Sequence, residues 1–283
     1  MLNKLLAHLQ YILPHHLLTW VIHKLARVRT VWFKNAMIRT IASRFGVNWS
    51  EALHQSPDDY PHFNAFFTRQ LKPGSRPLAS DENALLCPVD GAISSYGKIR
   101  ENQIFQAKGH GFSCEALLAD AAQAEKYQNG EYITIYLSPK DYHRIHMPLA
   151  GELTQMSHVP GRLFSVAPYT VDTIPRLFAR NERSVHHFDT PIGSHALVLV
   201  GAMLVASMET VWHGLINPPR AKKLRHYNYP AGEVKLDRGA EMGRFNMGST
   251  VVLLFPEGSL QWREGLEVGL VVKMGESLGS LSH

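Results

Sequence analysis

A glycine–serine pair stands just before a short apolar run near the carboxyl end of the sequence. Gly248 and Ser249 precede the run Val251-Val252-Leu253-Leu254-Phe255, which is closed by Pro256. A short β-branched and aromatic run of this kind predicts a buried strand. Glycine allows close backbone approach or a strained conformation. We therefore expect the Ser249 hydroxyl to be presented at the mouth of the strand.

Three uses are open for this hydroxyl. It could attack a substrate carbonyl, as in hydrolases. It could instead attack the carbonyl of Gly248 and turn the peptide bond into an ester. Loss of the Ser249 α-proton then expels the Gly248 carboxylate, and the enamine hydrolyses to an amino-terminal pyruvoyl group, a ketone that accepts an amine and draws electrons. The third use is a plain turn at the strand entry, for which Gly and Ser are common.

Two other stretches carry groups that could assist such a serine. Asp90 lies in Cys87-Pro88-Val89-Asp90-Gly91, where Asp-Gly is either a turn or a carboxylate that orients a base. His143 and His146 follow a predicted strand and stand three residues apart. Two histidines at this spacing could bind zinc, but a third ligand is not evident. Either imidazole could also serve as a base, because it titrates near neutral pH.

Asp90, His146 and Ser249 together could form a catalytic triad. The carboxylate would fix the imidazole, and the imidazole would take the hydroxyl proton. Ser249 does not lie in the Gly-x-Ser-x-Gly elbow of α/β-hydrolases. The one literal match is Gly275-Glu276-Ser277-Leu278-Gly279, too close to the end of the sequence for the helix that must follow it. Both facts weaken the hydrolase interpretation.

Composition and charge limit the class of protein. Of 283 residues, 45% are hydrophobic and 19% charged, so the chain can bury a sizeable core and is not grossly disordered. The two cysteines, Cys87 and Cys114, exclude a disulfide framework and a cysteine-based metal site. The net charge of +5 suits an anionic partner, either a phospholipid surface or a nucleic acid.

The first part of the sequence predicts amphipathic helices. Leu2, Leu5, Leu6, Leu9 and Leu13 follow helical spacing, and Pro14 should end or kink that helix. Two more apolar sets follow over 17–25 and 31–41, with basic residues between them. No window reaches the roughly twenty apolar residues of a spanning helix. Such helices would suit the bilayer interface or could simply pack on the core.

Further elements define a boundary near residue 75. A helix is expected to start near Asn48, and a short aromatic helix is expected within 60–74. Beyond Pro77, short apolar runs alternate with turn residues, which indicates a mainly β body. The predicted strands are Ala92–Ile99, Tyr132–Leu137, Gly151–Val159, Ala196–Met208 and Val251–Phe255. The fold class is thus α+β, with a helical region over 1–75 and a mainly β catalytic domain over 76–283.

Several long stretches, in order, resemble one family of proteins. They are Phe63-Asn64-Ala65-Phe66-Phe67-Thr68-Arg69-Gln70-Leu71-Lys72-Pro73-Gly74, Pro88-Val89-Asp90-Gly91, Tyr136 to His146, Pro160-Gly161-Arg162-Leu163-Phe164-Ser165-Val166, Leu177 to Arg183, Leu199-Val200-Gly201-Ala202 and Glu241-Met242-Gly243-Arg244-Phe245. With them the chain resembles the bacterial phosphatidylserine decarboxylases of the proteobacterial type. The family's processing motif is usually Leu-Gly-Ser-Thr, and here Met247 replaces the leucine with a side chain of similar volume.

The resemblance implies a self-cleaving proenzyme. The cut would fall between Gly248 and Ser249, giving a β chain of residues 1–248 and an α chain of residues 249–283 whose Ser249 becomes the pyruvoyl cofactor. Asp90, His146 and Ser249 match the family's charge-relay positions. The pyruvoyl carbonyl would form a Schiff base with phosphatidylserine and release carbon dioxide, giving phosphatidylethanolamine. We expect His143 to bind the substrate head group or to donate a proton.

The resemblance also implies partners and a location. We expect the α and β chains to form a heterodimer, with a homodimer of such protomers plausible, and no metal or nucleic acid to take part. The substrate is a bilayer lipid, so we expect peripheral attachment of the helical region to anionic phospholipid on the cytoplasmic face of the cell membrane. A serine hydrolase and a non-catalytic membrane-bound β domain remain the alternatives.

Overall fold

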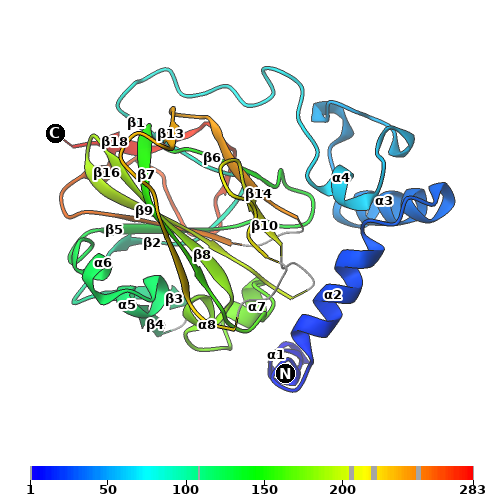
Figure 1. Cartoon of the computed structure of the whole chain (residues 1–283), viewed down its shortest axis with the longest axis horizontal. Helices are drawn as coiled ribbons and strands as arrows, with labels where there is room; N and C mark the ends of the chain where they lie inside the picture. Colours follow the sequence, from blue (N-terminus) through cyan, green and yellow to red (C-terminus); the bar gives the residue numbers. More distant parts are fainter. Residues whose placement is uncertain (1, 108, 204–206, 218–221, 247–249, 283) are drawn as a thin grey trace.

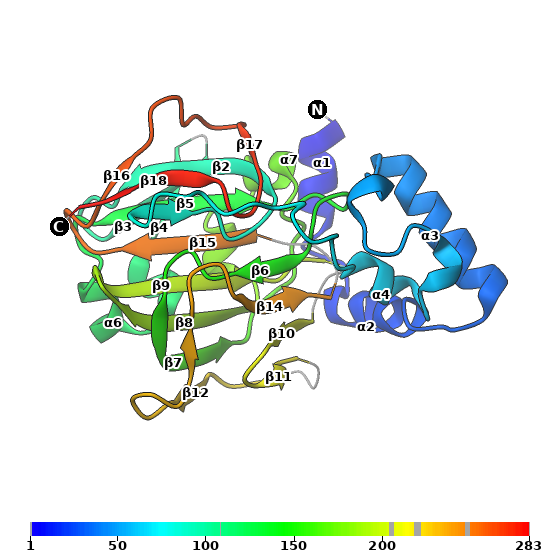
Figure 2. The same ribbon diagram turned by 90° about the horizontal axis from the view of Figure 1, so that it is seen from above.

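The computed structural model describes residues 2–107, 109–203, 207–217, 222–246 and 250–282. It has two visibly different parts (Figure 1): helices formed by the amino-terminal residues, and a body made mainly of strands. Figure 2 shows that the helices lie at one end of the molecule and the carboxyl terminus at the other. The α+β fold class with a mainly β body is therefore confirmed.

The amino-terminal part consists of short helices and turns. They are α1 (Leu2–Leu9), α2 (His15–Leu25), α3 (Val31–Phe45), the 3-10 turns η1 (Trp49–Glu51) and η2 (Pro57–Asp59), and α4 (Phe63–Phe67). Pro14 separates the first two helices, and Gly46 ends the third in a left-handed conformation with φ of 72°. The helix expected near Asn48 is wrong in extent: the Asn48 side chain caps only one 3-10 turn.

A small aromatic core holds these helices together. Phe63, Phe66 and Phe67 of α4 are buried against Ile38 and Ala42 of α3. The rings of Phe63 and Phe67 lie 5.8 Å apart between their centroids. The short aromatic helix predicted within 60–74 is confirmed, because its apolar side chains all face this core.

The body is built on one large antiparallel sheet. In the described residues its strands run in the order β12-β7-β8-β9-β15-β5-β2-β17, with β13 beside β7. Their bounds are β2 Gly91–Lys98, β5 Glu131–Tyr136, β7 Gly151–Val159, β8 Arg183–Thr190, β9 Gly193–Val200, β12 Arg225–Asn228, β13 Lys235–Leu236, β15 Thr250–Phe255 and β17 Val271–Val272.

Strand β15 lies inside this sheet, and both of its faces are covered. Val251, Leu253 and Phe255 face one hydrophobic cluster, while Val252 and Leu254 face the other. All six residues of the strand are buried. A strand covered on both faces reads as a continuous apolar run, which is why the strand predicted over Val251–Phe255 is confirmed.

Smaller sheets and short helices complete the body. One sheet has the order β11-β10-β14-β6, another β1-β18-β16, and β3 pairs with β4. The strands are β1 Ala84–Leu86, β3 Gln103–Ala107, β4 His110–Ser113, β6 Arg144–His146, β10 Met208–Thr210, β11 Gly214–Leu215, β14 Glu241–Phe245, β16 Leu260–Trp262 and β18 Ser277–Leu281. The helices are α5 Cys114–Leu118, α6 Ala121–Glu125, α7 Pro168–Val171 and α8 Leu177–Arg180.

Most strand predictions hold, and one does not. The strands predicted at Ala92–Ile99, Tyr132–Leu137 and Gly151–Val159 are confirmed as β2, β5 and β7. The single strand predicted over Ala196–Met208 is wrong, because β9 ends at Val200 and Met208 begins β10 in a different sheet. Ser277, in the only literal elbow match, lies in β18, so no helix follows it.

Candidate active site

The predicted cleavage residues Met247, Gly248 and Ser249 lie outside the described residues. Their described neighbours are Asn246, which follows β14, and Thr250, which begins β15. Thr250 pairs with Tyr136 of β5 on one side and with Val200 of β9 on the other. The Gly-Ser pair therefore comes immediately before a strand that is fixed in the middle of the main sheet.

His143 lies beside the strand that leads into this pair. Its main-chain carbonyl accepts a hydrogen bond from the Phe245 amide at 3.0 Å. Its ring is fully buried and stacks on Phe67, with centroids 4.1 Å apart. Neither ring nitrogen has a hydrogen bond of good geometry among the described residues, although the main chain of Ser138 lies near enough to act on the pKa of the ring. Burial and the nearby charge of Arg69 lower the pKa of His143 to about 3, so the ring is neutral at neutral pH.

His146 ends β6 and is held at both ring nitrogens. Nδ1 is 2.8 Å from the main-chain oxygen of Gly239, and Nε2 is 3.1 Å from the hydroxyl of Tyr142. Because a carbonyl only accepts, Nδ1 carries the proton and Nε2 is the basic nitrogen. Burial lowers the pKa of His146, while the Gly239 contact and then the charges of Glu241 and, less, of Asp90 act in the opposite direction. The neutral ring can therefore accept a proton at Nε2.

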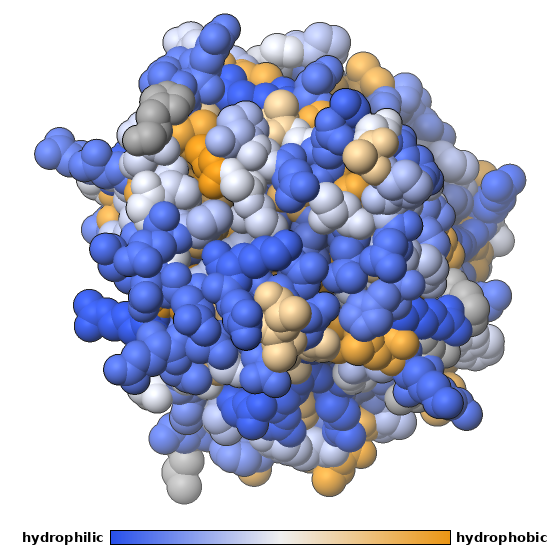
Figure 3. Space-filling view, turned by 60° about the vertical axis from the view of Figure 1, so that its left-hand side comes forward, coloured by the Kyte–Doolittle hydropathy of each residue, from blue (hydrophilic) through white to orange (hydrophobic). Residues whose placement is uncertain are grey.

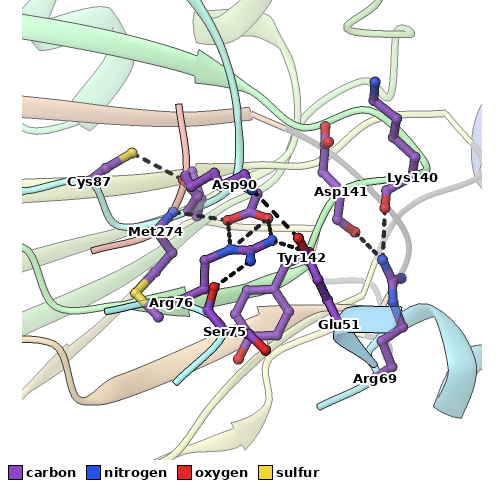
Figure 4. A network of polar contacts seen from close by, with 12 residues as sticks. Glu51, Arg69, Ser75, Arg76, Cys87, Asp90, Lys140, Asp141, Tyr142 and Met274 are labelled. Carbon is purple, nitrogen blue, oxygen red and sulfur yellow. Dashed lines mark hydrogen bonds and ion pairs between the residues drawn. The ribbon is translucent and has the colours of Figure 1, made fainter. Parts of the chain in front are cut away.

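Asp90 is held by groups other than His146. It lies in the turn between β1 and β2, where Arg76 Nε donates to its two carboxylate oxygens at 2.8 and 3.1 Å and Nη2 also contacts it (Figure 4). The Met274 amide donates to Oδ1 at 2.9 Å. In the described part of the chain no direct hydrogen bond joins Asp90 to His146. The carboxylate expected to fix the imidazole is thus replaced in that contact by the Gly239 carbonyl.

Arg76 links this carboxylate to the helical region. The same guanidinium donates to Glu51 of η1 at 2.8 Å and to the Ser75 carbonyl at 2.7 Å. The side chain is only 7% exposed, and these carboxylates raise its pKa against the effect of burial. Figure 4 shows how Asp90, Glu51 and Ser75 surround it. Charge-assisted contacts of this kind fix the orientation of a carboxylate strongly.

Sequence reasoning missed Arg76, Tyr142 and Gly239. Tyr142 stands one residue before His143, in the same stretch as the two histidines. A tyrosine at this position could have been predicted to place its hydroxyl near one of the imidazoles. Arg76 follows the Pro73-Gly74 turn and could have been paired with any acidic residue. Gly239 acts through its main-chain oxygen, for which no side-chain signal exists.

A pocket lies beside Tyr136, the residue of β5 that pairs with Thr250. This pocket of about 350 Å³ is lined by Tyr136 and by Phe105, Val166 and Val171 among others. This volume suits a small ligand or part of a larger one. Within the described ranges, no group of three or more His, Cys, Asp or Glu side chains is arranged to hold a metal ion.

Comparison with known proteins identifies the family. A family model described as phosphatidylserine decarboxylase matches residues 63–280, and a second, described as PSD, matches residues 5–46. A phosphatidylserine decarboxylase proenzyme of Methylococcus capsulatus is 51% identical over 278 residues, covering 98% of this chain and 96% of that protein. One of Pseudomonas putida is 52% identical over 284 residues and 99% of both chains.

A third relative extends the range of source organisms. The phosphatidylserine decarboxylase proenzyme of Hahella chejuensis is 53% identical over 273 residues, covering 96% of this chain and 92% of that protein. The class defined by these similarities is that of decarboxylases made as proenzymes. Within that class, the chain belongs to the phosphatidylserine decarboxylase family.

Proposed function

We propose that this chain is a proenzyme that cuts itself between Gly248 and Ser249 and then decarboxylates phosphatidylserine to phosphatidylethanolamine and carbon dioxide. The observation that carries the proposal is the similarity to phosphatidylserine decarboxylase proenzymes. This chain is 51% and 52% identical to two of them over 98% and 99% of its length. The position of Thr250 at the start of a central strand supports it, because a rigid strand can hold a new chain end in place.

The cut begins with proton transfer from Ser249. His146 Nε2 is the basic nitrogen of a ring held by Gly239, so it suits the role of proton acceptor once the Tyr142 hydroxyl gives way. The Ser249 oxygen then attacks the Gly248 carbonyl and forms an ester. Removal of the Ser249 α-proton expels the Gly248 carboxylate, and water converts the remaining enamine into the pyruvoyl ketone and ammonia. Asp90, paired with Arg76, supplies negative charge that favours the protonated imidazole.

The strand pairing supports a stable complex of the two resulting chains. Strand β15 of the small chain pairs with β5 and β9 of the large chain. Strand β18 pairs with β1 of the large chain as well. Because these backbone hydrogen bonds survive the cut, the α and β chains should remain a heterodimer. A homodimer of such protomers stays a prediction.

The pyruvoyl cofactor would supply a ketone that condenses with the substrate amine and withdraws electrons as carbon dioxide leaves. The unpaired ring nitrogens of His143, beside Phe245 just before the cut, fit such a site because buried polar atoms normally have partners. We assign His143 to holding the head group or to donating a proton to the carbon that loses carbon dioxide. The neutral ring can do either through its N–H group.

A variant pair tests the role of His143. In cut enzyme, His143→Ala should lower the decarboxylation rate or the affinity for substrate, and an unchanged rate and affinity would refute the role. His143→Phe serves as the matched variant, because it keeps the stack on Phe67 but has no nitrogen. If both variants lose activity equally while the Phe variant keeps its melting temperature, the loss belongs to the nitrogens and not to packing.

A denaturing gel with intact-mass measurement tests the cut itself. We expect two fragments, and a small chain that resists Edman sequencing because a ketone blocks its amino terminus. A serine hydrolase would instead give one chain labelled by a serine-directed probe, and a non-catalytic β domain one unlabelled chain. Ser249→Ala should give one intact chain. An active preparation of uncut wild-type protein would refute the proposal.

We also propose that the amino-terminal helices attach peripherally to anionic phospholipid, on the cytoplasmic face of the cell membrane. Ile12, Trp20 and Trp32 are 78%, 54% and 74% exposed. Lys24 and Arg29 stand between Trp20 and Trp32 in the sequence, and Lys24 Nζ lies 6.0 Å from the centre of the Trp20 ring. Apolar and basic side chains together suit the membrane interface. Figure 3 brings forward the side of the β body that lies on the left in Figure 1, and this face is mostly hydrophilic, with smaller separate apolar patches. No helix in the described ranges is long and apolar enough to cross a bilayer.

Vesicle binding tests the attachment. Removing the residues before Thr30 should weaken binding to vesicles that contain phosphatidylglycerol, but it also removes contacts such as that of Gln10 with the Ser165 amide. The double variant Ile12→Ser with Trp20→Ser is therefore sharper. Val271→Ser, which alters a residue 65% exposed on the β body, is the matched control. Equal binding of the double variant and the control would refute attachment through these helices.

A further inference from the structure

The guanidinium of Arg69 is buried with several N–H groups unused. Arg69 follows α4 and is only 5% exposed. Its Nη2 donates to the main-chain oxygens of Lys140 and Asp141 at 2.8 and 3.4 Å, as Figure 4 shows. Nε and Nη1 are buried and have no hydrogen-bond partner in the part of the chain that is described. Buried donors without a partner are rare in proteins and call for a ligand or a water.

The positive charge of Arg69 forms no direct ion pair among the described residues, although the more distant charges of Asp90 and Asp141 act on it. Asp141, whose main-chain oxygen accepts from Arg69, directs its carboxylate to the amide and hydroxyl of Ser138 at 2.6 and 2.8 Å. On the other side the guanidinium carbon lies 5.5 Å from the centre of the Phe66 ring. Arginine keeps its proton even when buried, and a buried charge without a partner is strongly unfavourable. The arrangement therefore fits an anion that arrives from outside.

Arg69 lies among other unpaired atoms close to the cut. Its charge acts on His143, whose two ring nitrogens are also unpaired. Asn64, from α4, donates to Asn246 at 3.0 Å, while its own Oδ1 is buried without a partner. His143 and Asn64 thus contact the two residues, Phe245 and Asn246, that stand just before the cleavage motif. Unpaired donors and acceptors therefore gather around the residues that stand just before the cleavage motif.

We propose that Arg69 binds the phosphodiester group of the lipid substrate and so selects for a phosphate-bearing head group. The inference rests on the proposed decarboxylase function. Of the two anions of phosphatidylserine, the carboxylate loses its charge as carbon dioxide leaves. A cation placed on it would stabilise the ground state more than the transition state. The phosphate keeps its charge throughout, so a fixed guanidinium helps binding without opposing the reaction.

The test compares two soluble substrates in cut, purified enzyme. Glycerophosphoserine carries the phosphate, while O-methylserine keeps the amine and carboxylate but has none. In Arg69→Met we expect kcat/KM for glycerophosphoserine to fall about 10- to 100-fold, mostly through KM, because a hydrogen bond to a charged group is lost. Turnover of O-methylserine should stay unchanged. Arg69→Lys should recover part of the loss, and Arg225→Met, at an exposed site on β12, should behave as wild type.

Each outcome decides the matter. Equal loss on both substrates, no loss on either, or a slower self-cleavage with an unchanged KM would overturn the assignment. If Arg69→Met fails to fold, inorganic phosphate provides a second measurement on wild-type enzyme. It should inhibit glycerophosphoserine turnover competitively but leave O-methylserine turnover unchanged, and the lysine variant should need more of it. Absence of inhibition overturns the proposal. Failure of the proposed decarboxylase function would show differently: the wild-type chain itself would stay uncut or would not turn over either substrate.

Discussion

Replacing Arg76 with methionine should destabilise the protein and slow its self-cleavage together. The methionine fills much of the same volume but removes the N–H groups that hold Asp90 and Glu51. Asp90 then keeps only the Met274 amide of these contacts, at 2.9 Å. Its side chain is 9% exposed, so water cannot take over the lost contacts. The perturbation therefore leaves a buried carboxylate without its cation.

The size of the effect follows from this burial. Removing one partner of a buried ion pair costs about 3–5 kcal/mol of unfolding free energy. The Arg76 and Asp90 side chains are 7% and 9% exposed, which places the pair in that class. The exposed pair of Lys235 and Glu152, with side chains 63% and 37% exposed, has a similar contact distance of 2.6 Å. Lys235→Met should change stability little, because water screens such a pair.

Urea unfolding in a Ser249→Ala background measures these changes on chains that are all uncut. Arg76→Met, Asp90→Asn and the double variant form a cycle, and we expect a coupling energy of about 2–3 kcal/mol for this contact. A coupling energy below about 0.5 kcal/mol would show that the ion pair does not hold Asp90 in solution. With Ser249 restored, Arg76→Met should accumulate uncut chain on a gel. Wild-type cleavage rate in that variant would refute the positioning role.

Two further predictions concern stability. Burial lowers the pKa of His186 to about 3 and those of His187 and His195 to about 4, below the ordinary 6.5. The unfolded chain therefore binds protons first, and stability should fall as pH drops from about 6.5 toward 4, by at most about 1.4 kcal/mol per pH unit for each ring. Unfolding of the uncut Ser249→Ala chain at several pH values measures this, and His195→Phe should flatten the slope; an unchanged slope contradicts the assignment. A Cβ on Gly243 would lie 2.3 Å from the Glu209 carbonyl oxygen. Gly243→Ala should therefore separate β10 from β14 and lower the melting temperature by several degrees. If the Gly243→Ala variant keeps the wild-type melting temperature, the two strands do not approach this closely.

Local patterns made several elements predictable. The run at Val251–Phe255 is apolar at every position because both faces of β15 are covered, and such a run needs no long-range information to be recognised. The strand predicted over Gly151–Val159 also matches β7 in both bounds, although its residues are mixed polar and apolar and only partly buried. The strand predicted over Ala196–Met208 failed because the chain leaves the main sheet after Val200 and joins another sheet. Apolar residues continue across that change, so hydrophobicity alone does not mark it.

The helical and β parts, the central strand and the order of motifs that resembles the decarboxylase family can all be read from the residues alone. What holds the candidate catalytic groups becomes visible only in the folded chain. The carbonyl that fixes His146 comes from Gly239, 93 residues further along, and an amide that holds Asp90 comes from Met274, 184 residues away. Because nearly every residue carries the same main-chain groups, no pattern of side chains in the sequence can predict which carbonyl or amide makes such a contact. Their partners are chosen by how the strands pair, and this choice exists only in the folded chain.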